Sequence, residues 1–125
     1  MILIASVMII GASLLVWFFA RGEDTVEEAI LPVGEVHNVV LEDDGYHPKE
    51  LHIEKGDAVR FSTSRAFEHW PASNLHPTHN IYAAFDAKRP LLPEETWQFQ
   101  FIKAGAWEFH DHLNATFIGV IHVAE

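Results

Sequence analysis

The hydrophobic pattern divides the chain into an uncharged N-terminal run and a longer region in which apolar and polar residues alternate. Residues 1–20 carry no charged side chain, and as a helix they would be about 30 Å long, enough to cross the core of a bilayer. Three aromatic residues precede Arg21, as interfacial aromatic residues do at the end of a membrane-spanning helix. The pattern predicts one transmembrane helix over residues 1–21.

A cleaved signal peptide is the alternative interpretation of this run. It lacks a basic segment at its start, and no clear cleavage site of small residues follows the aromatic residues. A buried helix of a soluble domain is disfavoured because the run is apolar on every side. We therefore expect an uncleaved anchor over residues 1–21, an acidic linker over residues 22–33 and a folded domain over residues 34–125.

Alternation with a period of two begins at Gly34 and predicts a domain built from β-strands. Turns that contain glycine or aspartate separate the alternating segments. The expected strands cover residues 36–42, 51–53, 59–63, 97–101, 107–109 and 119–124. The second and third of these strands are expected to form a hairpin. No amphipathic helix follows the anchor, so the pattern predicts an antiparallel sandwich or barrel.

A long segment between the expected strands has no regular pattern. Residues 64–93 contain four of the six prolines of the chain and no long periodic run. A stretch of this length without regular structure in a compact domain is usually a functional loop region. We therefore expect part of the functional site to lie there.

Charge and composition narrow the classes of partner. The chain has 18 acidic and 8 basic residues and a formal net charge of −10. This charge argues against nucleic acid and anionic lipid as partners, whereas a cation or a basic protein fits it. The absence of cysteine excludes disulfides, thiolate metal sites and thiol catalysis.

The uneven distribution of histidines along the chain suggests a metal site. Five of the nine histidines fall in two short stretches, residues 69–79 and 110–112. His110 and His112 are two residues apart on an extended segment, so their imidazoles project to the same side, roughly 7 Å apart at the backbone. Neutral imidazole suits zinc, copper, iron and nickel. We therefore expect this pair to close on one ion.

The expected ligand set combines this pair with histidines of the long loop. His69 follows an expected strand by a few residues, from where it can complete the pair across the end of the sandwich. The expected ligands are His69, His79, His110 and His112, with His76 and Asp111 as secondary candidates. Asp111 faces away from its neighbours, so capping a turn, hydrogen-bonding a histidine and binding the ion all stay open. The four remaining histidines are expected to be solvated, in strands or a turn.

Several linked motifs resemble the cupredoxin family. The segments 45–48 (Gly-Tyr-His-Pro) and 55–61 (Lys-Gly-Asp-Ala-Val-Arg-Phe) are similar to its N-terminal half. The segments 105–109 (Gly-Ala-Trp-Glu-Phe) and 119–123 (Gly-Val-Ile-His-Val) are similar to its C-terminal half. The resemblance covers roughly residues 34–123. It implies a Greek-key β-sandwich with a copper site at one end.

The chain departs from the family at the metal ligands. Small blue-copper members such as amicyanin carry cysteine, histidine and methionine ligands between the last two glycines. In an ungapped match these fall on Asp111, Asn114 and Phe117, so none of the three is retained. His110 and His112 fall instead where domains of multicopper oxidases carry a His-x-His pair. His69 matches the upstream histidine ligand of the family.

The resemblance and the histidine pattern together predict a membrane-anchored, extracytoplasmic copper protein with an all-histidine, non-blue site, and zinc is the second candidate ion. The expected role is copper capture, delivery or storage, with copper-handling or redox proteins of basic character as partners and no nucleic acid. Electron transfer is one alternative. A zinc or copper enzyme with an open three-histidine site is another, with Glu68 as a candidate base. A metal-free, partner-binding sandwich is the third.

Overall fold

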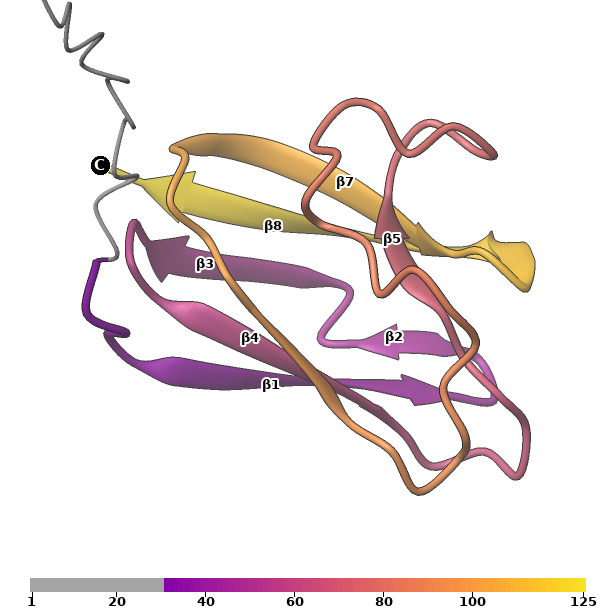
Figure 1. Ribbon diagram of the computed structural model, residues 1–125. Coiled ribbons are helices and arrows are strands. Elements are labelled where there is room, and N and C mark those ends of the chain that lie inside the picture. The colour runs from indigo at the N-terminus through magenta and orange to yellow at the C-terminus, as the bar shows by residue number, and fades with distance from the viewer. Residues whose placement is uncertain (1–30) are drawn as a thin grey trace, which may run out of the picture.

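The computed structural model describes residues 31–125, which form two β-sheets packed face to face (Figure 1). The strands are β1 (Val36–Glu42), β2 (Gly45–His47), β3 (Glu50–Glu54), β4 (Ala58–Thr63), β5 (Pro71–Ser73), β6 (Trp97–Gln100), β7 (Gly105–Asp111) and β8 (Asn114–Ala124). One sheet has the strand order β2-β1-β4-β6 and the other β3-β8-β7-β5. The prediction of an all-β sandwich is confirmed.

The predicted N-terminal helix lies outside the described residues, as does most of the acidic linker. Residues 31–125 include no helix that is long and apolar enough to span a membrane. The anchor over residues 1–21 and the domain boundaries therefore stay predictions.

The sheets are mixed, so the prediction of a purely antiparallel arrangement is wrong. β1 pairs with β4 in parallel, and β3 pairs with β8 in parallel. The predicted hairpin over residues 51–63 is also wrong, because β3 and β4 belong to different sheets. The Asp57 carboxylate accepts the backbone N–H of Glu35 at 2.9 Å and of Glu54 at 3.1 Å, and it holds the chain as it crosses between sheets. The alternation of apolar and polar residues determines which face of a sheet each side chain occupies. It does not determine which strand pairs with which.

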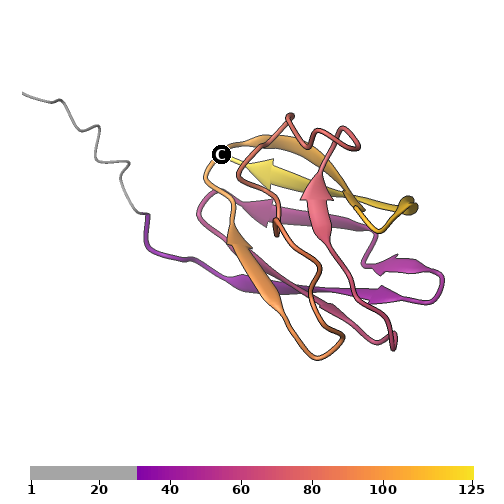
Figure 2. The same cartoon turned by 45° about the vertical axis from the view of Figure 1, so that its right-hand side comes forward.

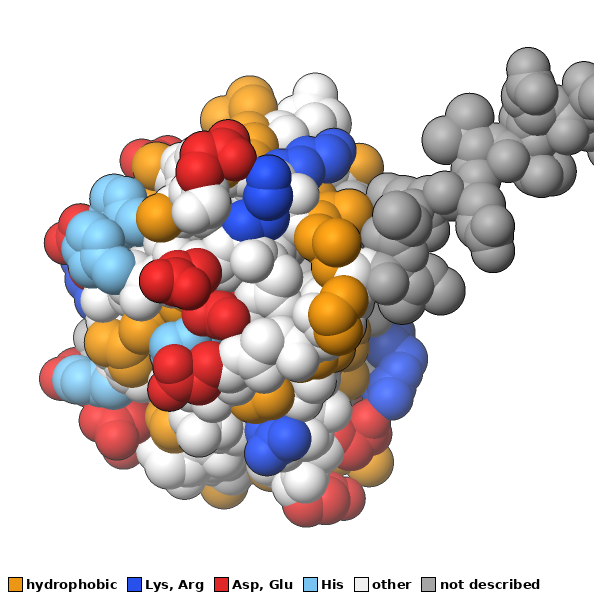
Figure 3. Space-filling model, turned by 90° about the vertical axis from the view of Figure 1, so that its left-hand side faces the viewer, with side chains coloured by type: hydrophobic (Ala, Val, Ile, Leu, Met, Phe, Trp, Pro, Cys, Tyr) orange, Lys and Arg blue, Asp and Glu red, His pale blue; other side chains and the backbone are white. Residues whose placement is uncertain are grey.

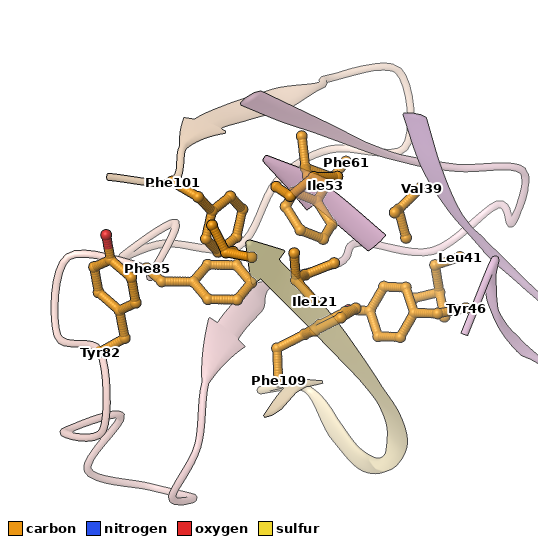
Figure 4. Close-up of a cluster of buried hydrophobic side chains, with 12 residues drawn as sticks. Val39, Leu41, Tyr46, Ile53, Phe61, Tyr82, Phe85, Phe101, Phe109 and Ile121 are labelled. Carbon is orange, nitrogen blue, oxygen red and sulfur yellow. The ribbon is translucent and has the colours of Figure 1, made fainter. Parts of the chain in front are cut away.

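The core is rich in aromatic side chains and draws on both sheets (Figure 4). In β4, Val59 and Phe61 are fully buried while Arg60 between them is exposed, as a strand with one face inward requires. Phe61 meets Phe109 of the opposite sheet edge to face, with ring centroids 5.4 Å apart. Burying each such ring contributes about 2–3 kcal/mol of transfer free energy.

The long connection between β5 and β6 is fixed to this core by two aromatic side chains, Tyr82 and Phe85, which are 3% and 0% exposed. Phe85 stacks on Phe99 at 5.4 Å. The Ser73 hydroxyl accepts the N–H of Tyr82 at 3.0 Å, and the Ser73 N–H donates to the Phe85 carbonyl at 2.7 Å. Figures 1 and 2 show this connection looping beside β7. The segment 64–93, expected to be irregular throughout, is interrupted by β5, and the irregular connection after it covers residues 74–96. Its anchors determine where His76 and His79 lie.

Candidate metal site

Four histidines converge where the long loop meets the end of β7. His76 and His79 come from the loop, His110 from β7, and His112 from the residue after β7 ends. One ring nitrogen of each lies within 4.8 Å of those of the other three. His76 Nδ1 is 3.1 Å from His110 Nε2, and His79 Nε2 is 2.9 Å from His112 Nδ1. The structure thus brings three of the four predicted ligands together and adds His76, a secondary candidate.

Two of these spacings match those between neighbouring ligands of a single ion. A metal–nitrogen bond of about 2.0 Å places adjacent nitrogen ligands about 2.8 Å apart at right angles and about 3.3 Å apart in a tetrahedron. The distances of 2.9 and 3.1 Å fall between these limits. Four imidazoles are a donor set that suits copper and zinc.

Two neighbouring side chains orient the buried imidazoles. His79 Nδ1 donates to Asp86 Oδ2 at 2.8 Å, and His110 Nδ1 donates to Asn74 Oδ1 at 3.0 Å. Each bond fixes the tautomer in which Nε2 carries the free lone pair and faces the centre. Asp86 is itself held by the Trp70 indole N–H at 2.7 Å. The sequence pattern did not predict the roles of Asp86 and Asn74. The one feature of the sequence that could have indicated them is their position in the same loop as two candidate histidines.

The backbone at His79 is itself constrained. His79 has a φ of 53°, in the left-handed region, and its N–H donates to the Leu75 carbonyl at 2.6 Å. This conformation costs a non-glycine residue on the order of 1 kcal/mol or more, and such residues concentrate at functional sites. The loop therefore holds His79 in one orientation.

The electrostatics of the group favour the neutral forms of His110 and His112 beside an ionised Asp86. His110 is 1% exposed, and burial, with the neighbouring imidazoles of His79 and His76, lowers its pKa to about 4. The pKa of His112 is lowered for the same reasons, with burial the largest. Burial acts to raise the pKa of Asp86, but hydrogen bonds from Trp70 and His79 outweigh it and hold the pKa below its usual value. The centre is thus an acceptor-rich site that favours a cation.

The group is open on one side. His76 is exposed and His112 is half-buried, whereas His79 and His110 are buried. The Trp70 ring covers part of His112, with ring centroids 4.3 Å apart. An ion can therefore reach the four nitrogens from the side of His76 without opening the core.

His69 lies outside this group. The structure therefore does not bring it together with the other three predicted ligands, His79, His110 and His112. Its side chain is fully buried, and its Nε2 donates to the Glu95 carbonyl at 3.1 Å. Its Nδ1 has no hydrogen-bond partner among the described residues. Burial lowers the pKa of His69, although the Glu95 carbonyl and the Asp111 carboxylate oppose this.

Asp111 also lies apart from the four imidazoles. Its Oδ1 accepts the backbone N–H of Trp70 at 2.8 Å and of Leu113 at 3.3 Å. Burial raises the pKa of this carboxyl group. Side chains alternate along a strand, so Asp111 faces away from the side on which His110 and His112 meet the loop. Of the three roles that the sequence left open for Asp111, the structure supports the first, capping the turn that follows β7.

The lowered pKa of His110 predicts that the metal-free protein loses stability in mild acid. An unfolded histidine takes up its proton near pH 6.5 but folded His110 only near pH 4, so between these values the unfolded state binds more protons. Stability should therefore fall as the pH drops from about 6.5 to about 4, by at most roughly 3 kcal/mol from this residue. Urea unfolding at pH 7, 6 and 5 measures the loss. His110→Gln should flatten the pH profile, and an unchanged profile in this variant would contradict the assignment.

The fold and this group define a cupredoxin-like β-sandwich with a candidate site built from imidazoles. Similar solved structures include a reduced amicyanin variant (20% identity, TM-score 0.58, covering 70% of this chain and 81% of that one). A purple cupredoxin from Nitrosopumilus maritimus is 14% identical, with a TM-score of 0.58 and coverage of 70% and 99%. A copper-containing nitrite reductase from Thermus scotoductus is 21% identical, with a TM-score of 0.59 and coverage of 76% and 23%.

These likenesses show the fold. The cupredoxin resemblance that the sequence motifs predicted is thereby confirmed at the level of architecture. No protein-family model and no curated protein matches the sequence. The chemistry of this chain therefore has to be argued from its own residues.

Proposed function

We propose that this protein binds a copper ion through His76, His79, His110 and His112 and serves copper capture, delivery or storage. The observation that carries this proposal is the convergence of four imidazole nitrogens within 4.8 Å of one another. Hydrogen bonds that aim two of the four nitrogens at the centre support it. The fold is also that of solved proteins named as cupredoxins and as a copper-containing reductase, and zinc is the second ion that the ligands suit.

The donor set favours metal handling over the other candidate functions. Blue-copper electron transfer relies on a thiolate ligand, and this chain has no cysteine. An enzyme site keeps a coordination position open for substrate, whereas four imidazoles fill every position of a tetrahedral ion and every strong, equatorial position of a tetragonal Cu²⁺ ion. The exposed His76 gives a partner protein access to the ion. The net charge of −10 favours a partner with a basic surface.

Each side chain of the group has a definable task. His79 and His110 are held by Asp86 and Asn74, so they form the rigid half of the site. His76 and His112 lie toward solvent and form the accessible half. A bound copper ion would be held by nitrogen ligands, without a thiolate. The accessible half is where exchange with a partner would begin.

The test is the absorption spectrum and copper content of the full chain, purified in detergent without a histidine tag. We expect at least one tightly bound Cu²⁺ per chain and only weak d–d absorption, because an intense visible band requires charge transfer from a thiolate. The paramagnetic resonance spectrum should be that of tetragonal nitrogen ligation. Failure to retain copper against a chelator, or an intense blue or red colour, would overturn the proposal.

We also propose that residues 1–21 anchor the domain to a membrane, with the domain on the extracytoplasmic side. The proposal rests on the uncharged run of residues 1–20 and on the charged, strand-forming sequence beyond it. Cell fractionation should place the full chain in membranes and resistant to extraction by high salt. Recovery of a soluble form cleaved near Ala20 would show a signal peptide instead.

A further inference from the structure

A second group of potential ligands lies on the outer surface of the β3-β8-β7-β5 sheet. His52 of β3 and His122 of β8 are direct partners in the parallel register. Their rings stack with centroids 4.4 Å apart and planes inclined by 8°. Glu50 lies two residues before His52 on the same face, and its Oε1 is 2.6 Å from His122 Nε2 and 4.0 Å from His52 Nε2. One ligand atom of each residue lies within 4.8 Å of the other two.

The packing of the sandwich does not require these three side chains. The residues that alternate with them, Ile53, Ile121 and Val123, fill the core, whereas the side chains of Glu50 and His52 are 60% and 75% exposed. On the face shown in Figure 3, exposed histidines lie beside acidic side chains. The two imidazoles and the carboxylate therefore meet at the surface, where an ion from solvent can reach them.

Two other groups of similar composition are less suited to an ion. In the first, the Asp57 carboxylate already accepts the N–H groups of Glu35 and Glu54 and contacts His37 at 3.0 Å, so its oxygens serve the crossing between sheets. In the second, His47 of β2 is the only imidazole and pairs with two carboxylates, Glu42 at the end of β1 and Asp44 in the turn between the strands. Among residues 31–125, Glu50, His52 and His122 form the one further group with two imidazoles.

We propose that Glu50, His52 and His122 form a second, solvent-open site for a divalent transition-metal ion, either Cu²⁺ or Zn²⁺. Two imidazoles and one carboxylate are a ligand set that these ions accept, and water fills the remaining positions. The site has one imidazole pair instead of two, and no buried residue orients it. It therefore binds at least about tenfold more weakly than the four-histidine site, a difference of the size that supporting contacts alone produce.

A surface groove links the second group to Asn74, a residue that supports the four-histidine site. Glu50, Asn74, Glu108 and His122 line a surface groove of ≈ 390 Å³. Asn74 also contacts His110 of the four-histidine site. His122 pairs with Ala106 on β7, and His110 lies four residues further along that strand, roughly 13 Å away. The weaker site thus lies on the same face of the sheet as His110, at a separate position along β7.

Calorimetric titration of the untagged full chain with Cu²⁺, in the presence of glycine to suppress nonspecific binding, tests this proposal. We expect a tight step and a second step at least tenfold weaker. His52→Ala and His122→Ala should each remove the second step and leave the first unchanged, and Glu50→Gln should weaken the second several-fold. His47→Ala, another exposed histidine beside carboxylates, is the matched control and should change neither step.

The outcomes separate this proposal from the function proposed above. If His110→Ala removes the tight step and the weak step persists, the two sites are distinct. A single step in the wild type, or a second step that survives both His52→Ala and His122→Ala, would overturn the second site and leave the four-histidine site untouched. Repeating the titration with Zn²⁺ shows which ion the second site prefers. Because His52 is exposed, His52→Ala should unfold at the same temperature as the wild type, which would show that lost binding is not lost folding.

Discussion

Replacing His110 or His112 with alanine is expected to lower the affinity of the tight site for Cu²⁺ by more than about 100-fold, because changing a supporting residue alone typically costs 10–100-fold. Each substitution removes one of the four converging nitrogens and leaves its partner, His76 or His79, facing a gap. Competition titration against a chelator of known affinity measures the loss. His79→Ala should lose as much, because His79 is buried and held in one orientation.

The supporting residues should have smaller, graded effects. Asp86→Asn keeps the shape of the side chain but weakens the acceptor that fixes the tautomer of His79, so we expect a loss of about 10–100-fold. Asn74→Ala removes the corresponding acceptor for His110 and belongs in the same range. His37→Ala, a histidine outside the four-histidine group, is the control. If Asp86→Asn cost more than His112→Ala, the carboxylate would itself be a ligand and the site would have to be redrawn.

The fold could be predicted from the sequence to the extent that alternation determines it. The segment 36–42 was expected as a strand and is β1, and residues 59–63 fall within β4. Alternation reports which side of a strand is buried, so it identified the strands and their inward residues. It carries no information on which strands pair. Because the chain crosses between the sheets at Asp57, the expected hairpin is instead a connection from one sheet to the other. β2 and β5 were missed because each is only three residues long, and β5 also begins with proline and is buried throughout.

The candidate site could be predicted only where a strand determines the direction of the side chains. His110 and His112 were identified because two residues along an extended chain return a side chain to the same side. Whether His69 or His76 lies beside His110 and His112 depends on the path of the loop. That path is set by the burial of Tyr82 and Phe85, contacts between residues distant in sequence. Asp86 was missed for the same reason, since it reaches His79 only after the loop has closed.

The substitution His69→Ala separates the four-histidine site from a site that would follow the family's upstream ligand. We expect His69→Ala to leave Cu²⁺ affinity unchanged within about threefold, because His69 lies outside the converging group. Stability should fall by about 2–4 kcal/mol, from a cavity at a fully buried position and from a Glu95 carbonyl left without its donor. In a domain of this size each kcal/mol corresponds to a shift in Tm of about 4–8 °C, so the loss is readily measured by thermal unfolding.

The decisive comparison is between His69→Ala and His76→Ala. His76 is exposed, so its substitution should barely change Tm while it removes one of the four nitrogens and weakens Cu²⁺ binding by more than about tenfold. His69→Gln retains a donor for the Glu95 carbonyl and should recover part of the lost stability, which an effect on metal binding would not predict. If His69→Ala abolishes copper binding in folded protein while His76→Ala binds normally, the ion sits at the buried His69 and the four-histidine group is not the copper site.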